Sequence, residues 1–171
     1  MSKIFIQDNF FEENIYNEIV QKMIAAEYDP PDDFHRKAHK GAYWHTHYIP
    51  NDCDVQKLIT KLIKEKFYFK ITKFLETYYT MVGASDKARP HIDSGNGCTH
   101  QCLIYMHGEE VTNNGTGFYH VIDKKTLEVK LNSHASFIKN RAIFFSSDVY
   151  HAPLQWQGGG SFRYSICNFF T

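Results

Sequence analysis

Three side chains in this sequence could together hold a metal ion. His91 and Asp93 are separated by one residue, and His151 follows much later in the chain. Residues i and i+2 of an extended segment project to the same side, so His91 and Asp93 could reach one ion while Ile92 points into the core. Two imidazoles and one carboxylate can occupy one face of a ferrous ion and leave its other positions open for O2. The pattern therefore predicts a mononuclear Fe(II) centre.

An arginine follows the third histidine, in a segment of otherwise apolar and aromatic residues. Arg163 is flanked by Phe162 and Tyr164. A buried guanidinium requires a carboxylate or phosphate partner. That partner is either an Asp or Glu of a neighbouring strand, or the carboxylate of a ligand that two guanidinium nitrogens hold at once. Ser165 lies on the same side of the segment and could donate a further hydrogen bond to such a ligand.

Two segments before residue 68 have the periodicity of amphipathic helices. Apolar residues recur at helical spacing in 12–28 and again in 54–67, which predicts a helix in each segment. Asp8 or Asn9 could cap the first helix. We expect both helices to lie against an apolar surface formed by the rest of the chain.

After residue 67, short runs rich in aromatic and β-branched residues alternate with turn residues, a pattern typical of a sandwich or barrel. The expected strands are 70–81, 88–92, 100–107, 117–122, 126–131, 142–146 and 162–169. The expected turns include 83–86, 94–97, 112–116 and 158–160. Together with the helices, these strands predict a mainly β fold with flanking helices (α+β), in which two N-terminal helices pack on a mostly antiparallel sandwich.

The length and composition indicate one domain. A chain of 171 residues can bury one substantial core, so we expect a single domain over 1–171, with helical support in 1–67 and the β core in 68–171. An aromatic content of 16%, with 14 Phe and 11 Tyr, favours strands. Four scattered cysteines do not resemble a disulfide framework, which indicates a reducing, cytoplasmic setting.

The charge balance disfavours two classes of partner. Nineteen basic residues against 19 acidic residues give a formal net charge of zero, so we expect no nucleic-acid partner and no anionic membrane surface. The first seven residues are too short and too polar for a secretory signal, and no apolar run approaches the ~18 residues of a membrane span. We expect a soluble protein whose partner is a small molecule or a peptide.

Six segments carry a specific resemblance because of their order and spacing. They are IFIQDNFFEENIYNEIV, RPHID, CLIYMHG, NNGTGFYHV, NRAIFFSSDVYHAP and SFRYSICNFF. In this order they resemble the Fe(II)- and 2-oxoglutarate-dependent oxygenases, and within them the prolyl-hydroxylase-like branch, over nearly the whole chain. The resemblance implies a double-stranded β-helix (a cupin-like jelly roll), with the metal at the open end between its two sheets.

The resemblance also implies a reaction. His91, Asp93 and His151 would be the metal ligands and catalytic residues, with 2-oxoglutarate as cosubstrate, O2 as oxidant and ascorbate as a candidate further requirement. Decarboxylation of 2-oxoglutarate to succinate and CO2 would accompany hydroxylation of an unactivated C–H bond in a peptide side chain, an amino acid or a small metabolite. Because Asp93 supplies the carboxylate that halogenating relatives lack, hydroxylation is favoured over halogenation.

Further residues would hold the cosubstrate. The resemblance implies that Arg163 and Ser165 bind the far carboxylate of 2-oxoglutarate. It also implies that the Tyr105 hydroxyl reaches this carboxylate, although Tyr105 could instead be an ordinary core residue. Tyr79 would line the pocket wall, unless its neighbour Tyr78 is the one that faces inward.

Several alternatives stay open. Cys98, His100 and Cys102 could form a zinc site. The segment 35–47, which contains four histidines, is either a surface loop or a lid over the metal, and Trp156 could border the substrate entrance. The chain could also be a cupin-type enzyme with redox-neutral chemistry, which would need no carboxylate clamp, or a non-catalytic interaction module.

Overall fold

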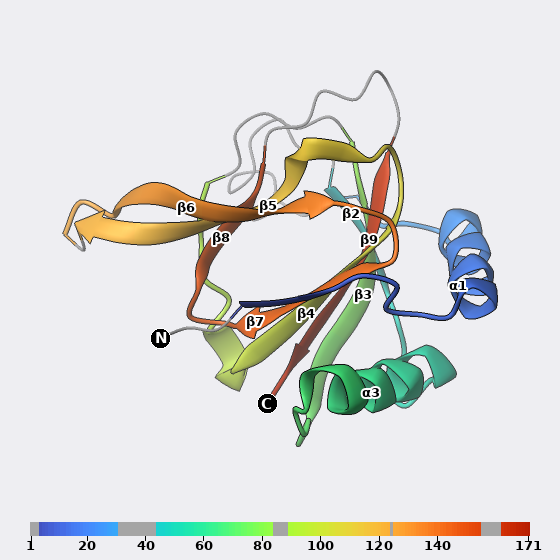
Figure 1. Cartoon of the computed structure of the whole chain (residues 1–171). Helices are drawn as coiled ribbons and strands as arrows, with labels where there is room; N and C mark the ends of the chain where they lie inside the picture. The colour runs from blue at the N-terminus through green and yellow to red at the C-terminus, as the bar shows by residue number, and fades with distance from the viewer. Residues whose placement is uncertain (1–3, 31–43, 84–88, 124, 155–161) are drawn as a thin grey trace.

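The computed structural model describes residues 4–30, 44–83, 89–123, 125–154 and 162–171. These residues form strands that enclose an interior and helices that lie outside them (Figure 1). In chain order the elements are β1 (Ile4–Gln7), α1 (Glu13–Ala25), β2 (Trp44–Tyr48), α3 (Asp54–Phe67), β3 (Phe74–Val82), the 3-10 turn η1 (Gly95–Gly97), β4 (His100–His107), β5 (Val111–Asp123), β6 (Glu128–Phe137), β7 (Arg141–Ser146), β8 (Tyr150–Pro153) and β9 (Arg163–Phe170).

Two antiparallel sheets make up the β core. The larger sheet has six strands in the order β1-β7-β4-β9-β3-β2, and the smaller has three in the order β6-β5-β8. An interior cluster lies between them and contains Tyr105, Phe118, Phe137, Ile143 and Phe145. Beyond this core, β5 and β6 continue as a projecting two-stranded ribbon (Figure 1). The expected mainly β fold with two N-terminal helices is therefore confirmed.

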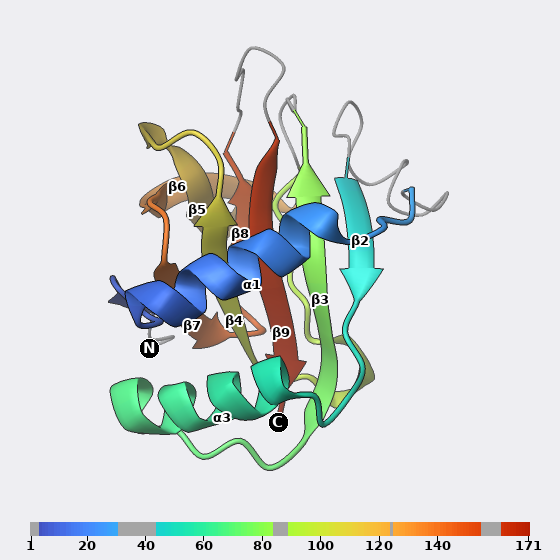
Figure 2. The ribbon, with the colours of Figure 1, turned by 90° about the vertical axis from the view of Figure 1, so that its right-hand side faces the viewer.

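Both helices cover the outer face of the six-stranded sheet (Figure 2). Helix α1 buries Ile19, Val20 and Met23, and α3 buries Ile59 and Ile63. These positions recur at helical spacing, so each helix presents one apolar stripe to the sheet. None of the described helices is both long enough and apolar enough to cross a membrane.

The helix predictions are close to the observed elements. Helix α3 has the predicted bounds, whereas α1 is shorter than the predicted 12–28. The expected cap is wrong, because Glu12 occupies the N-cap position and makes no side-chain cap hydrogen bond. Asn9 adopts a φ of 51°, so the chain turns there, before the helix begins.

The strand predictions fail where the backbone is irregular. The segment 88–92 forms no named strand in its described part, and only His91 makes an isolated bridge, to His151. The turn expected at 112–116 is wrong, because these residues belong to β5. The register of β5 with β6 shifts between Val111 and Gly115, so the strand accommodates this polar run as an irregularity. Strands β2 and β8 were not expected from periodicity. Strands β1 and β2 form the two edges of the six-stranded sheet, so 1–67 contributes strands as well as helices. The expected turns at 83–86 and 158–160 lie partly or wholly outside the described residues.

Gly115 allows β5 and β6 to approach closely, and its replacement gives a stability prediction. Its φ is +134°, and a Cβ there would lie 1.9 Å from the carbonyl oxygen of Ala135. We expect Gly115→Ala to lower the free energy of unfolding by about 3 kcal/mol, because the backbone must shift and adopt a disfavoured φ. For a chain of this size, thermal unfolding should then occur roughly 6–12 °C lower.

Gly95→Ala is the matched control for that measurement. A Cβ at Gly95 would meet no atom within 4 Å, so its unfolding temperature should stay close to that of the unmodified protein. Equal unfolding temperatures for the two variants, measured by circular dichroism, would contradict the account of Gly115.

Candidate active site

Backbone hydrogen bonds bring the two histidine-bearing segments together. His91 and His151 exchange N–H···O bonds in both directions, each 2.9 Å long, and the amide of Asp93 donates to the carbonyl of Ser147 at 3.0 Å. His151 lies in β8, which pairs with β5. The extended segment that contains His91 and Asp93 is thus held alongside the edge of the smaller sheet.

The structure brings together the three side chains that the sequence analysis selected as metal ligands. Asp93 Oδ1 lies 3.6 Å from His91 Nε2, and Asp93 Oδ2 lies 3.3 Å from His151 Nε2. One ligand atom from each residue lies within 4.8 Å of the other two. The expectation for Ile92 is wrong: it is 39% exposed and does not enter the core.

Hydrogen bonds to backbone carbonyls orient both imidazoles. His91 Nδ1 lies 3.1 Å from the carbonyl oxygen of Arg89, and His151 Nδ1 lies 3.0 Å from that of Val149. Because a carbonyl oxygen only accepts, Nδ1 carries the proton in each neutral ring and Nε2 presents a lone pair. The atoms that face one another are then all electron-pair donors, so the residues fit a divalent cation such as Fe(II).

Asp93 is held in its charged form by the groups around it. Burial would by itself raise the pKa of the Asp93 carboxyl. When no metal is bound and the rings are protonated, a hydrogen bond from His151, the charges of His151 and His91, and a hydrogen bond from Gln101 outweigh burial and lower this pKa below its usual value. Gln101 Nε2 donates to Asp93 Oδ2 at 3.1 Å. Gln101 therefore positions the carboxylate that faces both imidazoles.

A partly enclosed cavity of about 170 Å³ extends from this triad between the two sheets. This volume is below the ~300–1,000 Å³ of pockets that take drug-sized ligands, so the space suits a small molecule. Its walls combine apolar side chains with a few polar groups. The polar or charged lining residues away from the triad include Tyr78, Thr80, Tyr105, Thr116, Arg163 and Ser165.

Arg163 places a positive charge in this cavity. Its side chain is almost fully buried, donates a hydrogen bond from Nη1 to Asn114 Oδ1, and lies 5.3 Å from the centroid of the Phe137 ring. Burial lowers the pKa of the Arg163 guanidinium to about 10, against an opposing effect of Tyr105. The guanidinium is therefore charged at neutral pH and can bind an anionic group.

Ser165 and Tyr105 lie in the same cavity. Both are buried and line the cavity with Arg163. The hydroxyl of Tyr105 donates to Thr116 Oγ1 at 2.7 Å, and burial raises the pKa of this phenol above its usual value. The same hydroxyl lies 3.3 Å from the carbonyl oxygen of Ala135, so Tyr105 is a protonated donor held near two acceptors.

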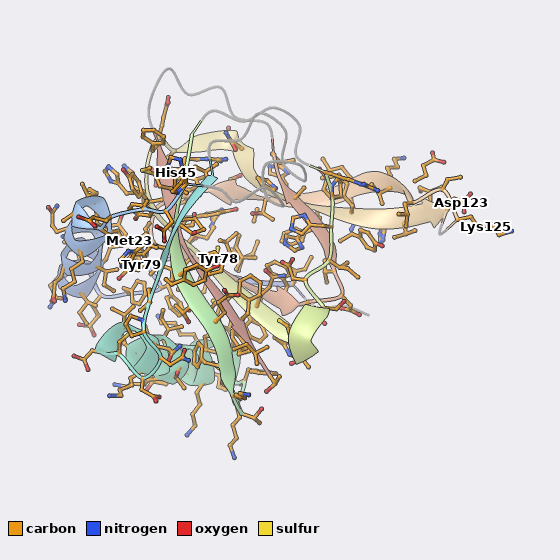
Figure 3. The ribbon with its side chains drawn as sticks, turned by 180° about the vertical axis from the view of Figure 1, so that it is seen from behind. Met23, His45, Tyr78, Tyr79, Asp123 and Lys125 are labelled. Atoms are coloured by element: carbon orange, nitrogen blue, oxygen red, sulfur yellow. The ribbon has the colours of Figure 1, made fainter. Side chains whose placement is uncertain are left out.

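The placement of Tyr79 is a correction. Tyr79 packs in the core beneath the helices, with its ring centroid 5.8 Å from that of His47, whereas Tyr78 lines the cavity. Figure 3 shows the two tyrosines on opposite sides of β3, with Tyr79 near Met23 of α1. Alternation along a strand requires that only one of them faces inward, but it does not say which.

Two polar residues of the site were not expected. Gln101 fixes Asp93, and Asn114 accepts the hydrogen bond from Arg163. Both are amides within strands, where neither spacing nor charge distinguishes them from surface residues. Their buried positions are the only signal, and that signal requires the fold.

The alternative zinc site does not form. Cys102 is fully buried in the core beneath the helices, and the ring of His100 stacks on Phe144 with centroids 5.4 Å apart. Among the residues that the structure describes, only His91, Asp93 and His151 form a group able to hold a metal. In the candidate lid 35–47, residues 44–47 belong to β2 and not to a loop; the rest of it, and Trp156, lie outside the described residues.

Comparisons with known proteins support the fold at low sequence identity. No family model and no curated protein matches the sequence. A Pseudomonas putida prolyl-4-hydroxylase is 13% identical with a TM-score of 0.66, over 99% of this chain and 93% of that chain. A Trichoplax adhaerens prolyl hydroxylase, in complex with a peptide fragment of the hypoxia inducible factor oxygen degradation domain, is 15% identical with a TM-score of 0.68, over 98% and 82%.

A third similar structure is an enzyme of another reaction type. SnoN, a non-heme alpha ketoglutarate dependent epimerase from nogalamycin biosynthesis, is 10% identical with a TM-score of 0.71, over 99% of this chain and 78% of that chain. These likenesses show that the chain has the double-stranded β-helix fold of the 2-oxoglutarate- and Fe(II)-dependent oxygenases, which confirms the predicted fold.

Proposed function

We propose that this protein is an Fe(II)- and 2-oxoglutarate-dependent oxygenase. One observation carries the proposal: a triad of two histidines and an aspartate lies at one enclosed cavity with a buried, charged arginine. Neither the triad nor the arginine alone would distinguish an oxygenase from another metal-binding jelly-roll protein. Together they match a ligand that binds a metal at one end and carries a carboxylate at the other.

In this proposal the triad binds the metal, and Arg163 and Ser165 bind the cosubstrate. His91, Asp93 and His151 would hold Fe(II), which supplies the capacity to activate O2 when it is bound. The guanidinium of Arg163 would hold the far carboxylate of 2-oxoglutarate, and the hydroxyl of Ser165 would donate to the same group. Holding both ends of the cosubstrate fixes its orientation before O2 binds.

The remaining walls of the cavity are largely apolar. The apolar side chains of Leu103, Phe137 and Pro153 line it between the two charged ends. In such surroundings the guanidinium acts on a carboxylate more strongly than it would in water. The Tyr105 hydroxyl lies in the same lining, and we propose that its O–H turns from Thr116 to donate to this carboxylate when 2-oxoglutarate binds.

The proposed reaction is hydroxylation of an unactivated C–H bond, with conversion of 2-oxoglutarate and O2 to succinate and CO2. The Asp93 carboxylate occupies a coordination position that a halide would need, which supports hydroxylation over halogenation. The likeness to a prolyl hydroxylase that binds a peptide supports a peptide side chain as one kind of substrate, beside amino acids and small metabolites.

Epimerisation is a second candidate, because SnoN has the highest TM-score of the three structures described above. For epimerisation, too, the triad would hold Fe(II) and Arg163 would hold 2-oxoglutarate. The two candidates differ in the mass of the product, since hydroxylation adds one oxygen atom and epimerisation adds none.

The test is turnover of 2-oxoglutarate. Purified protein with Fe(II), ascorbate and O2 should convert 2-oxoglutarate to succinate, and pools of peptides and metabolites should raise the rate and yield a product heavier by one oxygen. A stimulated rate with a product of unchanged mass would favour the epimerase. Absence of succinate with every pool would favour redox-neutral chemistry or an interaction module.

A further inference from the structure

A second, more open cleft reaches the metal site from outside the enclosed cavity. Its volume is about 1,010 Å³, and Tyr78, Asp93 and Phe169 line both spaces. Because Asp93 belongs to the triad, a molecule in this cleft could contact the carboxylate that would hold the metal. We name this space the aromatic cleft.

The register of β3 and β9 places the aromatic cleft away from the arginine. Val82 pairs with Arg163 at one end of these strands, and Phe74 pairs with Phe170 at the other. The enclosed cavity is lined by Thr80 and Val82, whereas the cleft is lined by residues 75–78. If 2-oxoglutarate occupies the cavity with its far carboxylate at Arg163, the cleft offers a separate approach to the triad.

One wall of the cleft is a row of aromatic rings. The ring centroids of Tyr48 and Tyr78 are 5.5 Å apart, and those of Tyr78 and Phe169 are 5.7 Å apart. Tyr48 is 55% exposed, so the row begins at the surface and continues inward. Burial raises the pKa of the Tyr78 phenol well above its usual value, so the phenol is neutral, and the face of its ring can attract a cation.

The charges of the cleft are of one sign. Its described lining contains two acidic residues, Glu76 and Asp93, and none of its described lining residues is Lys, Arg or His. The Asp93 charge is offset once a cation binds at the triad, whereas the Glu76 carboxylate is exposed and unaffected by it. Aromatic faces beside a carboxylate attract cations and do not attract anions.

We propose that the aromatic cleft binds the primary substrate of the oxygenase and that this substrate carries an alkylammonium or guanidinium group. The cation would lie against the rings of Tyr48 and Tyr78 within reach of Glu76, and the attached carbon chain would extend to the metal. The inference rests on the proposed function, which it narrows to basic amino acids, or to lysine and arginine side chains of peptides.

Ligand binding can be measured without turnover. With Mn(II) in place of Fe(II) and with 2-oxoglutarate present, proton relaxation in NMR reports both affinity and proximity to the metal. The cationic probes are lysine and arginine, each free and as the Nα-acetyl amide. The neutral probes of matched shape are the Nα-acetyl amides of norleucine and citrulline, which carry no ammonium or guanidinium group. We expect the cations to bind about tenfold more tightly and to show metal-induced relaxation. Free and capped forms distinguish an amino-acid substrate from a peptide side chain.

Glu76→Gln tests the carboxylate. We expect it to weaken cation binding about fivefold, the upper range for an exposed charge pair, and to leave neutral probes unchanged. Glu109→Gln is the matched control, because it removes another exposed carboxylate that lies outside the cleft lining. It should change neither the affinity for the cationic probes nor that for the neutral probes.

Equal affinity for the Nα-acetyl amides of lysine and norleucine would overturn the inference, as would an equal loss of affinity for both in Glu76→Gln. If Mn(II) or 2-oxoglutarate itself fails to bind the unmodified protein, the proposed function falls, and the inference falls with it. The two failures are distinguishable because cosubstrate binding is measured first, before any probe is added.

Discussion

Replacing His91 and Asp93 together by alanine is expected to abolish stoichiometric binding of Fe(II) or Ni(II) and all succinate formation. The variant keeps one of the three donors, His151, and a single imidazole cannot hold a divalent ion against water. Loss of a supporting residue alone typically costs 10–100-fold in metal affinity, so loss of two ligands should exceed about 100-fold. Metal content after dialysis, measured by mass spectrometry, and succinate release report the two effects separately.

The variant should still fold, because neither side chain belongs to either apolar core cluster. His120→Ala is the matched control, since His120 is an exposed histidine on β5 outside the triad. We expect it to retain one metal per chain. Retention of a full complement of metal by His91→Ala/Asp93→Ala would show that the ion binds elsewhere and would remove the basis of the proposed function.

The sequence predicts the fold and the triad well because each depends on strong, local patterns. The run 54–67 has the periodicity of a helix and forms α3 with the same bounds, and 100–107 forms β4 as expected. The His91–Asp93 spacing requires only an extended backbone to direct both side chains to one side. An isolated bridge to His151 is sufficient to provide that backbone, although no regular strand forms at 88–92.

What could not be predicted depends on contacts between distant segments. Tyr78 and Tyr79 are equivalent by pattern, and the inward one is decided by which face of β3 the helices cover. Gln101 and Asn114 acquire their roles only when β4 and β5 meet the triad and Arg163. The polar run 112–116 indicates a turn, yet it pairs with β6 because a glycine permits an irregular strand there.

Arg163→Ala is expected to keep the metal and to weaken 2-oxoglutarate more than tenfold, or by more than about 1.4 kcal/mol. The guanidinium is buried and charged, and a carboxylate placed beside it gains a charge-assisted hydrogen bond in a site that excludes water. Alanine would leave the far carboxylate of 2-oxoglutarate desolvated without a partner. Titration calorimetry with Mn(II)-loaded protein measures this affinity apart from turnover.

Arg163→Lys separates charge from geometry, because lysine keeps the positive charge but lacks the planar fork. We expect its affinity to lie between those of the alanine variant and the unmodified protein. Arg141→Ala is the control: Arg141 pairs with Asp8 through contacts of 2.5 and 2.8 Å and does not line the cavity, so only stability should change. Unchanged cosubstrate affinity in Arg163→Ala would favour the structural alternative, in which this arginine pairs within the protein and not with a ligand.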